Sequence, residues 1–317
     1  MRTMSTKRTL PRLLQTPAVL LLLVWMLVPL SMTLYFSFIR YVLNSNIRPE
    51  WTTPSLSNWR GWGNYEYVLL NAKDFWFAVT NSLFIVGSIL ILTVIIGLAI
   101  AVLINKSFPG RGIVRVLLIS PFFVMPAVNA VLWINMILDP VLGLNGLAVA
   151  GINDLVIGLK DAPIVGSFFA LWPEIEPISF RATQTSAYAV IIMVTWQWTP
   201  FAVLIFMTSL QSEDQQQKEA AVLDGANAWS QFRNLTIPHL ARPIAIVIMI
   251  QSIFHLSLYA EIEIVSRGNG NKNLPYLIGE FASNNIGAAS AAGIFAVILA
   301  NIVAFFLLRM IGKSLMD

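Results

Sequence analysis

The chain contains no cysteine and only two histidines, His239 and His255. Without cysteine there is no disulfide framework, no thiolate nucleophile and no cysteine-ligated metal. Two histidines are too few for a metal site built on histidine alone, although a mixed site with carboxylates stays open. Charged residues are also scarce, at 11% of the chain against about a quarter in soluble domains. We expect no catalytic and no metal-binding residues in this chain.

A nucleotide-binding loop is missing as well. The glycine-rich loop that holds phosphate groups ends in Gly-Lys-Ser or Gly-Lys-Thr. The glycine-rich stretch at 268–272 reads Gly-Asn-Gly-Asn-Lys and has the wrong spacing for such a loop. We therefore expect that the chain neither hydrolyses ATP nor carries a cofactor.

Apolar residues, in contrast, make up 57% of the chain and gather in long runs. About 20 apolar residues are enough to cross the hydrocarbon core of a membrane. The first run is too long for a cleaved signal peptide and lacks a small-residue cleavage site. The sequence predicts an all-α, polytopic membrane protein with six transmembrane helices, at 17–38, 77–104, 114–138, 187–210, 243–264 and 287–311. We expect one transmembrane domain over 17–311, with tails at 1–16 and 312–317.

One further apolar segment, at 142–170, is interrupted by charged and amide side chains and by a proline. Charges are costly in hydrocarbon, so we interpret this segment as interfacial or packed structure outside the membrane. A re-entrant segment is the alternative.

The basic residues favour one orientation. With six spans, twelve of the lysines and arginines fall on the side that holds both termini, and eight fall on the other side. Acidic residues show the opposite bias, five against eleven. Because cytoplasmic loops are enriched in lysine and arginine, both termini and the polar loop at 213–242 are predicted to be cytoplasmic.

That polar loop carries the most specific pattern of the chain. It reads Glu219-Ala220-Ala221, then Asp224-Gly225-Ala226, and then Leu235-Thr236-Ile237-Pro238. Helix-forming residues at 215–222 are followed by a glycine, which permits a sharp reversal. A second helical stretch at 226–232 is predicted to stop at Pro238, which has no amide hydrogen. The pattern predicts two short helices at an angle, a rigid shape suited to a groove on a partner.

This pattern resembles the EAA loop of binding-protein-dependent ABC importers, where the loop is the coupling helix that docks on a cytoplasmic ATPase. Further matches to the sugar-type permeases of that family lie before the second span, in the third span and before the last span. They cover most of residues 17–311 and are closest to a half-permease that pairs with a second, different one. The matching residues include Gly61, Asn64, Tyr65, Asn81, Pro121, Pro126, Trp133, Asp139, Gly143, Asn145 and Gly287.

The resemblance implies a bacterial inner-membrane permease that forms half of a translocation path for a sugar or sugar alcohol. It also implies a second permease subunit, two ATPase subunits that hold ATP and Mg²⁺, and a periplasmic binding protein, with no nucleic acid among the partners. The scarcity of cations within the spans agrees with a neutral substrate rather than phosphate or sulfate.

Within the loop, the resemblance assigns ATPase coupling to seven residues. Glu219 is expected to pair with a basic group or to cap backbone amides, and Gly225 is expected to make the bend. Small side chains at Ala220 and Ala221 permit close approach, while Leu235, Ile237 and Pro238 anchor the exit.

The substrate path is predicted from polar and aromatic residues inside the spans, because such groups usually face a bundle interior. Gln251, His255 and Tyr259 are spaced by four, so a continuous helix would align them in one stripe. The other candidates are Asn129 and Trp133 on the third span, and Trp196 and Gln197 on the fourth. The alternative for each residue is a structural contact between helices.

Two other classes of protein are the alternatives. An ion-coupled secondary transporter could use Glu261, Glu263 and His255 as proton carriers, but it would have no ATPase for the loop to dock on. An intramembrane enzyme is disfavoured because the chain lacks a Ser/His/Asp pattern, a His-Glu metal motif and a cysteine nucleophile.

Overall fold

The computed structural model describes residues 6–43, 52–106, 108–160, 166–169 and 171–316. Within these residues the chain is helical, with two isolated β-bridges and no β-strand, so the all-α prediction is confirmed. The chain forms two compact units, Met1–Phe75 with Leu277–Leu299, and Trp76–Tyr276 with Ala300–Asp317. The predicted single domain with two tails stays a prediction, and residues 1–5 and 317 of those tails lie outside the described residues.

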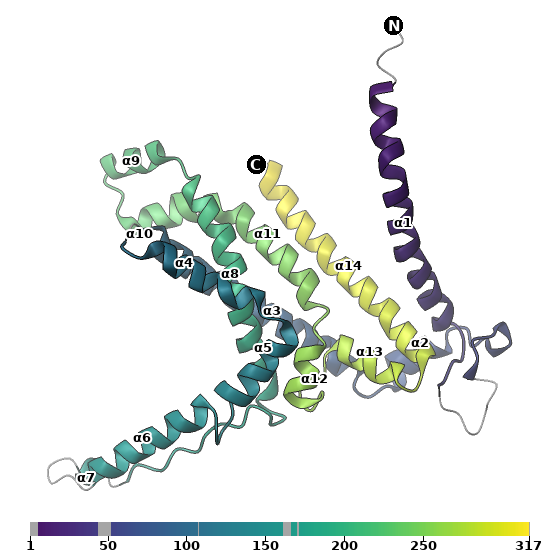
Figure 1. Ribbon diagram of the computed structural model, residues 1–317, viewed down its shortest axis with the longest axis horizontal. Coiled ribbons are helices and arrows are strands. Elements are labelled where there is room, and N and C mark those ends of the chain that lie inside the picture. The colour runs from purple at the N-terminus through teal and green to yellow at the C-terminus, as the bar shows by residue number, and fades with distance from the viewer. Residues whose placement is uncertain (1–5, 44–51, 107, 161–165, 170, 317) are drawn as a thin grey trace. The chain divides into compact units, whose positions relative to one another are not determined.

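The helices alternate between long membrane-spanning ones and short ones near the ends of the spans (Figure 1). In chain order they are α1 (Thr6–Ser37), η2 (Leu56–Asn58), α2 (Gly63–Glu66), η3 (Tyr67–Asn71), α3 (Phe75–Asn105), α4 (Arg111–Ile119), η4 (Ser120–Phe123), α5 (Pro126–Leu132), η5 (Trp133–Ile137), α6 (Leu144–Lys160), α7 (Gly166–Phe169), α8 (Ser186–Gln211), α9 (Gln215–Leu223), α10 (Ala228–Gln231), η6 (Phe232–Thr236), α11 (Ile237–His255), α12 (Ala260–Ser266), α13 (Leu274–Ala282) and α14 (Ile286–Met316).

Among the described residues, five helices are long and apolar enough to cross a membrane, and a bent pair makes up to six. The bent pair is the third predicted span, which divides into Arg111–Phe123 and Pro126–Ile137 at an angle of 102°. The span predicted over 114–138 is therefore present as a broken helix rather than a continuous one. Pro126 has no amide hydrogen to continue the helix, and the residue before a proline is driven to an extended conformation, which Met125 adopts.

In the first unit, one buried amide side chain donates hydrogen bonds to backbone carbonyls at the end of α1. Asn64 in α2 donates hydrogen bonds to the carbonyls of Ser37 and Ile39, at 2.9 and 2.7 Å, and accepts one from Arg60. The start of α14 packs against this point, and a Cβ on Gly287 would lie 2.6 Å from the Ile39 carbonyl oxygen. Close approach therefore requires glycine at this position.

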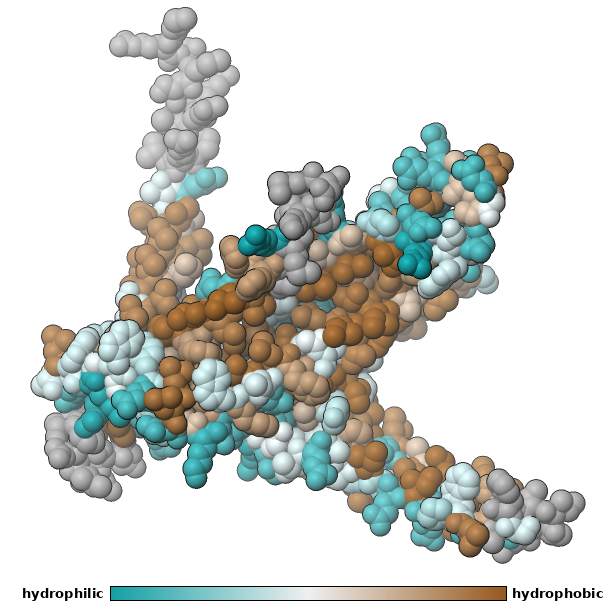
Figure 2. Space-filling view, turned by 180° about the vertical axis from the view of Figure 1, so that it is seen from behind, coloured by the Kyte–Doolittle hydropathy of each residue, from teal (hydrophilic) through white to brown (hydrophobic). Residues whose placement is uncertain are grey.

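In the second unit, α8 is the central helix, with two thirds of its apolar window buried. One apolar cluster joins it to α3, α5 and α12, and another joins its other half to α3 and α11. Figure 2 shows apolar side chains gathered over the spanning helices, with polar ones at α9 and α10. This distribution is typical of a membrane protein with one polar projection.

Outside the spans, α6 and the chain that returns from it form an arm that extends from η5 (Figure 1). Asn153 exchanges two hydrogen bonds with the backbone of Ile175, and Asn145 donates to the carbonyl of Ile178. Before α6, the backbone amides of Leu142 and Val141 hold the pKa of Asp139 below its usual range. The described part of the segment 142–170 is thus no seventh span, and residues 161–165 and 170 lie outside the described residues.

We expect Gly287→Ala to lower stability by about 1–3 kcal/mol, because the added methyl group overpacks the Ile39 carbonyl. The measurement is the midpoint of heat-induced aggregation of the purified subunit in detergent. Gly293→Ala is the matched control on the same helix, since its Cβ would meet only Thr33 Cγ2 at 3.8 Å. Equal midpoints for the two variants would contradict the close approach at Gly287.

Candidate functional site

The polar loop between α8 and α11 folds as two short helices around a sharp turn. Asp214 begins α9 by accepting a hydrogen bond from the Gln216 amide at 2.9 Å. At the other end, Gly225 has a φ of +82°, with Ala226 N–H bonded to Ala221 O and Gly225 N–H bonded to Val222 O. This pair of bonds is the Schellman motif that ends many helices. The predicted break at Gly225 is confirmed.

The second half of the loop differs from the prediction. Helix α10 begins at Ala228 rather than at 226, because Asn227 caps it by accepting from the Ser230 amide at 2.8 Å. The helix does not stop at Pro238 but continues through the π-helical turn η6 into α11. A proline ring clashes with the carbonyl four residues earlier in a regular α-helix, and the wider π turn relieves that conflict just before Pro238.

The predicted coupling residues divide between the first helix and the exit. Glu219 lies exposed in α9 and accepts a hydrogen bond from the Gln215 amide at 3.2 Å. It does not cap the helix start, because Asp214 fills that role. Ala220 and Ala221 share this short helix, while Leu235, Ile237 and Pro238 belong to the continuous exit helix.

Three exposed apolar side chains at the tip of the loop were not predicted. Leu223 is 88% exposed, Trp229 is 68% exposed and Val222 is 59% exposed. They flank the turn at Gly225, in a loop whose first helix and turn are mostly polar. Their apolar character in a mostly polar segment is the sequence signal that could have identified them. Together they offer a partner an apolar surface.

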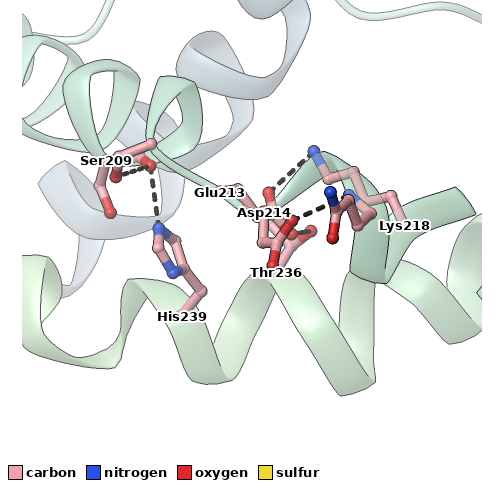
Figure 3. A network of polar contacts seen from close by, with 8 residues as sticks. Ser209, Glu213, Asp214, Lys218, Thr236 and His239 are labelled. Atoms are coloured by element: carbon pink, nitrogen blue, oxygen red, sulfur yellow. Dashed lines mark hydrogen bonds and ion pairs between the residues drawn. The ribbon is translucent and has the colours of Figure 1, made fainter. Parts of the chain in front are cut away.

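At the base of the loop, a set of polar contacts joins three helices (Figure 3). Glu213 forms an ion pair with Lys218 and accepts a hydrogen bond from Thr236. His239 Nε2 lies 2.9 Å from the carbonyl oxygen of Ser209 near the end of α8. None of these four side chains was singled out from the sequence.

Most predicted path residues meet around the middle of α8. Gln197 is hydrogen-bonded to Asn129 of α5 at 3.0 Å, and its amide nitrogen donates to the carbonyl of Val124 at the break in the third span. The rings of Trp196 and Trp133 lie 5.7 Å apart in edge-to-face contact. The structure therefore brings together the candidates from the third and fourth spans.

Two candidates from α11 reach the same segment of α8. Gln251 donates to the carbonyl of Trp198 at 3.4 Å, and the His255 ring lies 4.9 Å from the Trp198 ring. Both side chains are buried. Among the described residues, four polar atoms here have no hydrogen-bond partner: Asn129 Oδ1, Trp133 Nε1, Gln251 Oε1 and His255 Nε2.

Tyr259 does not belong to the predicted stripe. Helix α11 ends at His255, and Tyr259 lies at the start of α12, where its ring stacks on that of Tyr276 at 5.7 Å. After α11 the chain turns through 256–258, and the carbonyl of Leu258 accepts a hydrogen bond from Asn273 at 2.6 Å. The predicted span over 243–264 therefore ends early.

An apolar groove of about 300 Å³ lies between α3, α4 and α8. Trp196 lines it, but the other predicted path residues do not. Its lining is almost wholly apolar, which does not suit a ligand rich in hydroxyl groups. The polar atoms around Trp196–Trp198 are the better candidate site.

The membership of the chain in a protein family is settled by residues 93–317. They match the family described as the binding-protein-dependent transport system inner membrane component. The chain belongs to this family. It is a permease subunit of an ABC importer and a multi-pass inner-membrane protein.

Several permeases resemble the chain over most of its length. The ABC transporter permease protein YcjO of Escherichia coli is 29% identical over 294 residues, which are 90% of this chain and 91% of that protein. The trehalose/maltose permease MalF of Thermococcus litoralis is 26% identical, over 80% and 75% of the two chains. The arabinooligosaccharides permease AraP of Bacillus subtilis is 25% identical, over 97% and 90%.

A solved structure shows the same fold. It is a crystal structure of a bacterial ABC transporter involved in the import of the acidic polysaccharide alginate. The TM-score is 0.72 at 19% sequence identity, and the match covers 97% of this chain and 96% of the other. The ABC importer permease fold predicted from the sequence is thereby confirmed.

The burial of the α11 candidates predicts how fast they react with a hydrophilic thiol reagent. Gln251→Cys and His255→Cys should react about tenfold more slowly than Tyr259→Cys, because buried sites react only after local opening, and Tyr259 is 45% exposed. The measurement is the labelling rate of each variant, in a chain that has no native cysteine. Ile253→Cys, exposed on the same helix, reports whether the reagent reaches that depth. Equal rates at 251, 255 and 259 would show that the two buried positions are open.

Proposed function

We propose that this chain forms half of the translocation path for a sugar or a sugar alcohol in an ATP-driven bacterial importer. Its partners would be a second, different permease subunit, two cytoplasmic ATPase subunits and a periplasmic binding protein. ATP and Mg²⁺ would be held by the ATPase subunits. The observation that carries this proposal is the capped helix–turn–helix loop, which lies beyond the ends of α8 and α11 and exposes Leu223 and Trp229.

The loop has the properties of a rigid docking element. Side chains cap the start of both short helices, and the Schellman bonds fix the turn between them. Little conformational entropy is therefore lost when a partner binds. An apolar tip surrounded by polar residues suits a groove on a soluble ATPase, with Glu219, Ala220 and Ala221 on the same short helix.

The polar atoms around the middle of α8 support a neutral, hydroxyl-rich substrate. Asn129 and Gln251 offer unpaired carbonyl oxygens, and Trp133 offers an unpaired N–H donor. A sugar hydroxyl both donates and accepts, so it can satisfy both kinds of group. The aromatic rings of Trp133 and Trp196 present flat apolar faces of the kind that suit sugar rings. The trehalose, maltose and arabinooligosaccharide permeases among the relatives agree with this substrate class.

The ion-coupled alternative gains no support from the geometry. Of its three candidate proton carriers, Glu261 and Glu263 lie on α12, whereas His255 ends α11. His255 packs on Trp198, while Glu263 lines a surface pocket beside Arg181 and Arg267.

The energy source can be tested directly. We expect uptake by the assembled transporter to require ATP and to persist when an uncoupler collapses the proton gradient while ATP is maintained. The measurement is binding-protein-dependent uptake of a radiolabelled sugar into proteoliposomes with ATP inside. A Walker-lysine variant of the ATPase subunit is the control and should abolish uptake. Uptake that stops on uncoupling at constant ATP would favour the secondary transporter.

The coupling role of the loop predicts opposite results for two substitutions at one position. Gly225→Pro should abolish ATPase association and transport, because proline cannot adopt the φ of +82° found there. Gly225→Asn should retain both, because asparagine tolerates left-handed angles and a Cβ at this position meets no atom within 4 Å. Co-purification of the ATPase subunits is measured beside membrane insertion. Normal co-purification with Gly225→Pro would remove the basis for the coupling role.

A further inference from the structure

The junction between α8 and α9 contains a carboxylate that the coupling motif does not explain. Helix α8 ends at Gln211 and α9 begins at Gln215, so Glu213 lies in a short connection. Connections of this kind are usually solvated, yet the side chain of Glu213 is only 5% exposed. A carboxylate is rarely withdrawn from water in this way unless it is paired.

Both oxygens of Glu213 have a partner, and the partners come from different elements. Oε2 lies 2.9 Å from the Lys218 ammonium nitrogen on α9. Oε1 accepts a hydrogen bond from the Thr236 hydroxyl, at 3.0 Å, on the π turn that leads into α11 (Figure 3). One side chain therefore joins the end of α8, the coupling helix and the base of α11.

A second contact fixes α8 to α11 beside it. His239 Nε2 donates to the Ser209 carbonyl at 2.9 Å, one of the last carbonyls of α8. Below it, Phe206 and Leu210 of α8 pack with Leu240 and Val247 of α11 in one buried cluster. Because interdigitated apolar side chains resist sliding, the two spans behave as one body at this end.

Glu213 links the coupling helix α9 to the paired ends of α8 and α11. If α9 were displaced alone, the buried carboxylate would lose Lys218 or Thr236 and remain without a full set of partners. Removing one partner from a buried charge costs more than an exposed pair contributes. Displacement of α9 together with α8 and α11 keeps both contacts, so this movement is favoured over bending at the junction.

We propose that Glu213 is a positioning residue that makes a movement of the coupling helix α9 move α8 and α11 with it. This inference rests on the proposed function, because it assigns to Glu213 the transmission of ATPase movement. The two spans that it joins carry Gln197 and Gln251, which belong to the candidate path. Glu213, Lys218 and Thr236 thus form a joint between the loop that faces the ATPase and the two helices that carry the candidate substrate path.

The test distinguishes a loss of transmitted movement from a loss of ATPase binding to the loop. Glu213→Leu removes both contacts and leaves no buried charge, and Thr236→Val removes one contact at nearly constant volume. Each variant is assembled with its partner subunits and binding protein, and three quantities are measured: co-purification of the ATPase, basal ATP hydrolysis, and sugar transported per ATP hydrolysed. A charge exchange, Glu213→Lys with Lys218→Glu, keeps an ion pair across the same gap.

We expect Glu213→Leu to retain the ATPase and basal hydrolysis while transport per ATP falls about fivefold or more, the lower range of coupling between distant sites. Thr236→Val should cause a smaller fall. The double variant Glu213→Leu with Thr236→Val should be no worse than Glu213→Leu alone, because both changes break one shared contact. The charge exchange should restore most of the lost transport.

Asn234→Ala is the matched control. Asn234 donates an exposed hydrogen bond to Ser230 on the same turn, at 3.1 Å, and its loss should leave transport per ATP unchanged. The inference is overturned if Glu213→Leu matches this control, or if it loses the ATPase and the charge exchange restores nothing. Failure of the proposed function looks different, because the wild-type complex would then show no ATP-dependent uptake.

Discussion

The structure depends on one constraint, which is that a carbonyl freed by a break in a membrane helix must still find a hydrogen-bond donor. In this chain the donors are amide side chains from other elements. The Gln197 side chain donates to the carbonyl of Val124 at the bend in the third span, and Asn273 donates to the carbonyl of Leu258 after α11. Asn64 donates to the carbonyls of Ser37 and Ile39 at the end of α1. Each of these three breaks therefore has its own amide, and each amide holds the segment that carries it against the break.

The same constraint separates the two interpretations of the polar residues in the spans. Gln197 and the amide nitrogen of Asn129 are occupied by contacts between helices, so at these atoms the structural interpretation holds. Asn129 Oδ1, Gln251 Oε1 and His255 Nε2 are buried without a partner among the described residues. An unpaired buried polar group is costly, so these atoms gain most from a ligand hydroxyl. One side chain can thus position a helix with one atom and face the substrate with another.

Features encoded by neighbouring residues were predictable, and features set by distant ones were not. The spanning helices follow from runs of apolar residues, and the turn at Gly225 follows from one glycine inside a helical pattern. Helix α11 ends at His255, and the chain after it is held by Asn273, 15 residues beyond Leu258, so a spacing of four wrongly placed Tyr259 in the stripe. Pro238 misled for a different, local reason, since the π turn just before it accommodates the ring. The structure groups the other predicted path residues around α8 but not Tyr259, because spacing identifies a helix face but not where the helix ends.

The joint at Glu213 is also set by residues that are distant in the sequence. Its importance follows from the rigidity of the elements on either side of it. Both short helices of the loop are capped, so the loop itself has little freedom to absorb a displacement. Helices α8 and α11 are joined through His239 and their shared apolar cluster, so they have little freedom to slide. The connection at 212–214 is a place where such a displacement would be lost as bending. A buried carboxylate with partners on both sides of that connection resists the bend, and the movement passes along α8 to the segment Trp196–Trp198, where Asn129, Trp133 and His255 meet.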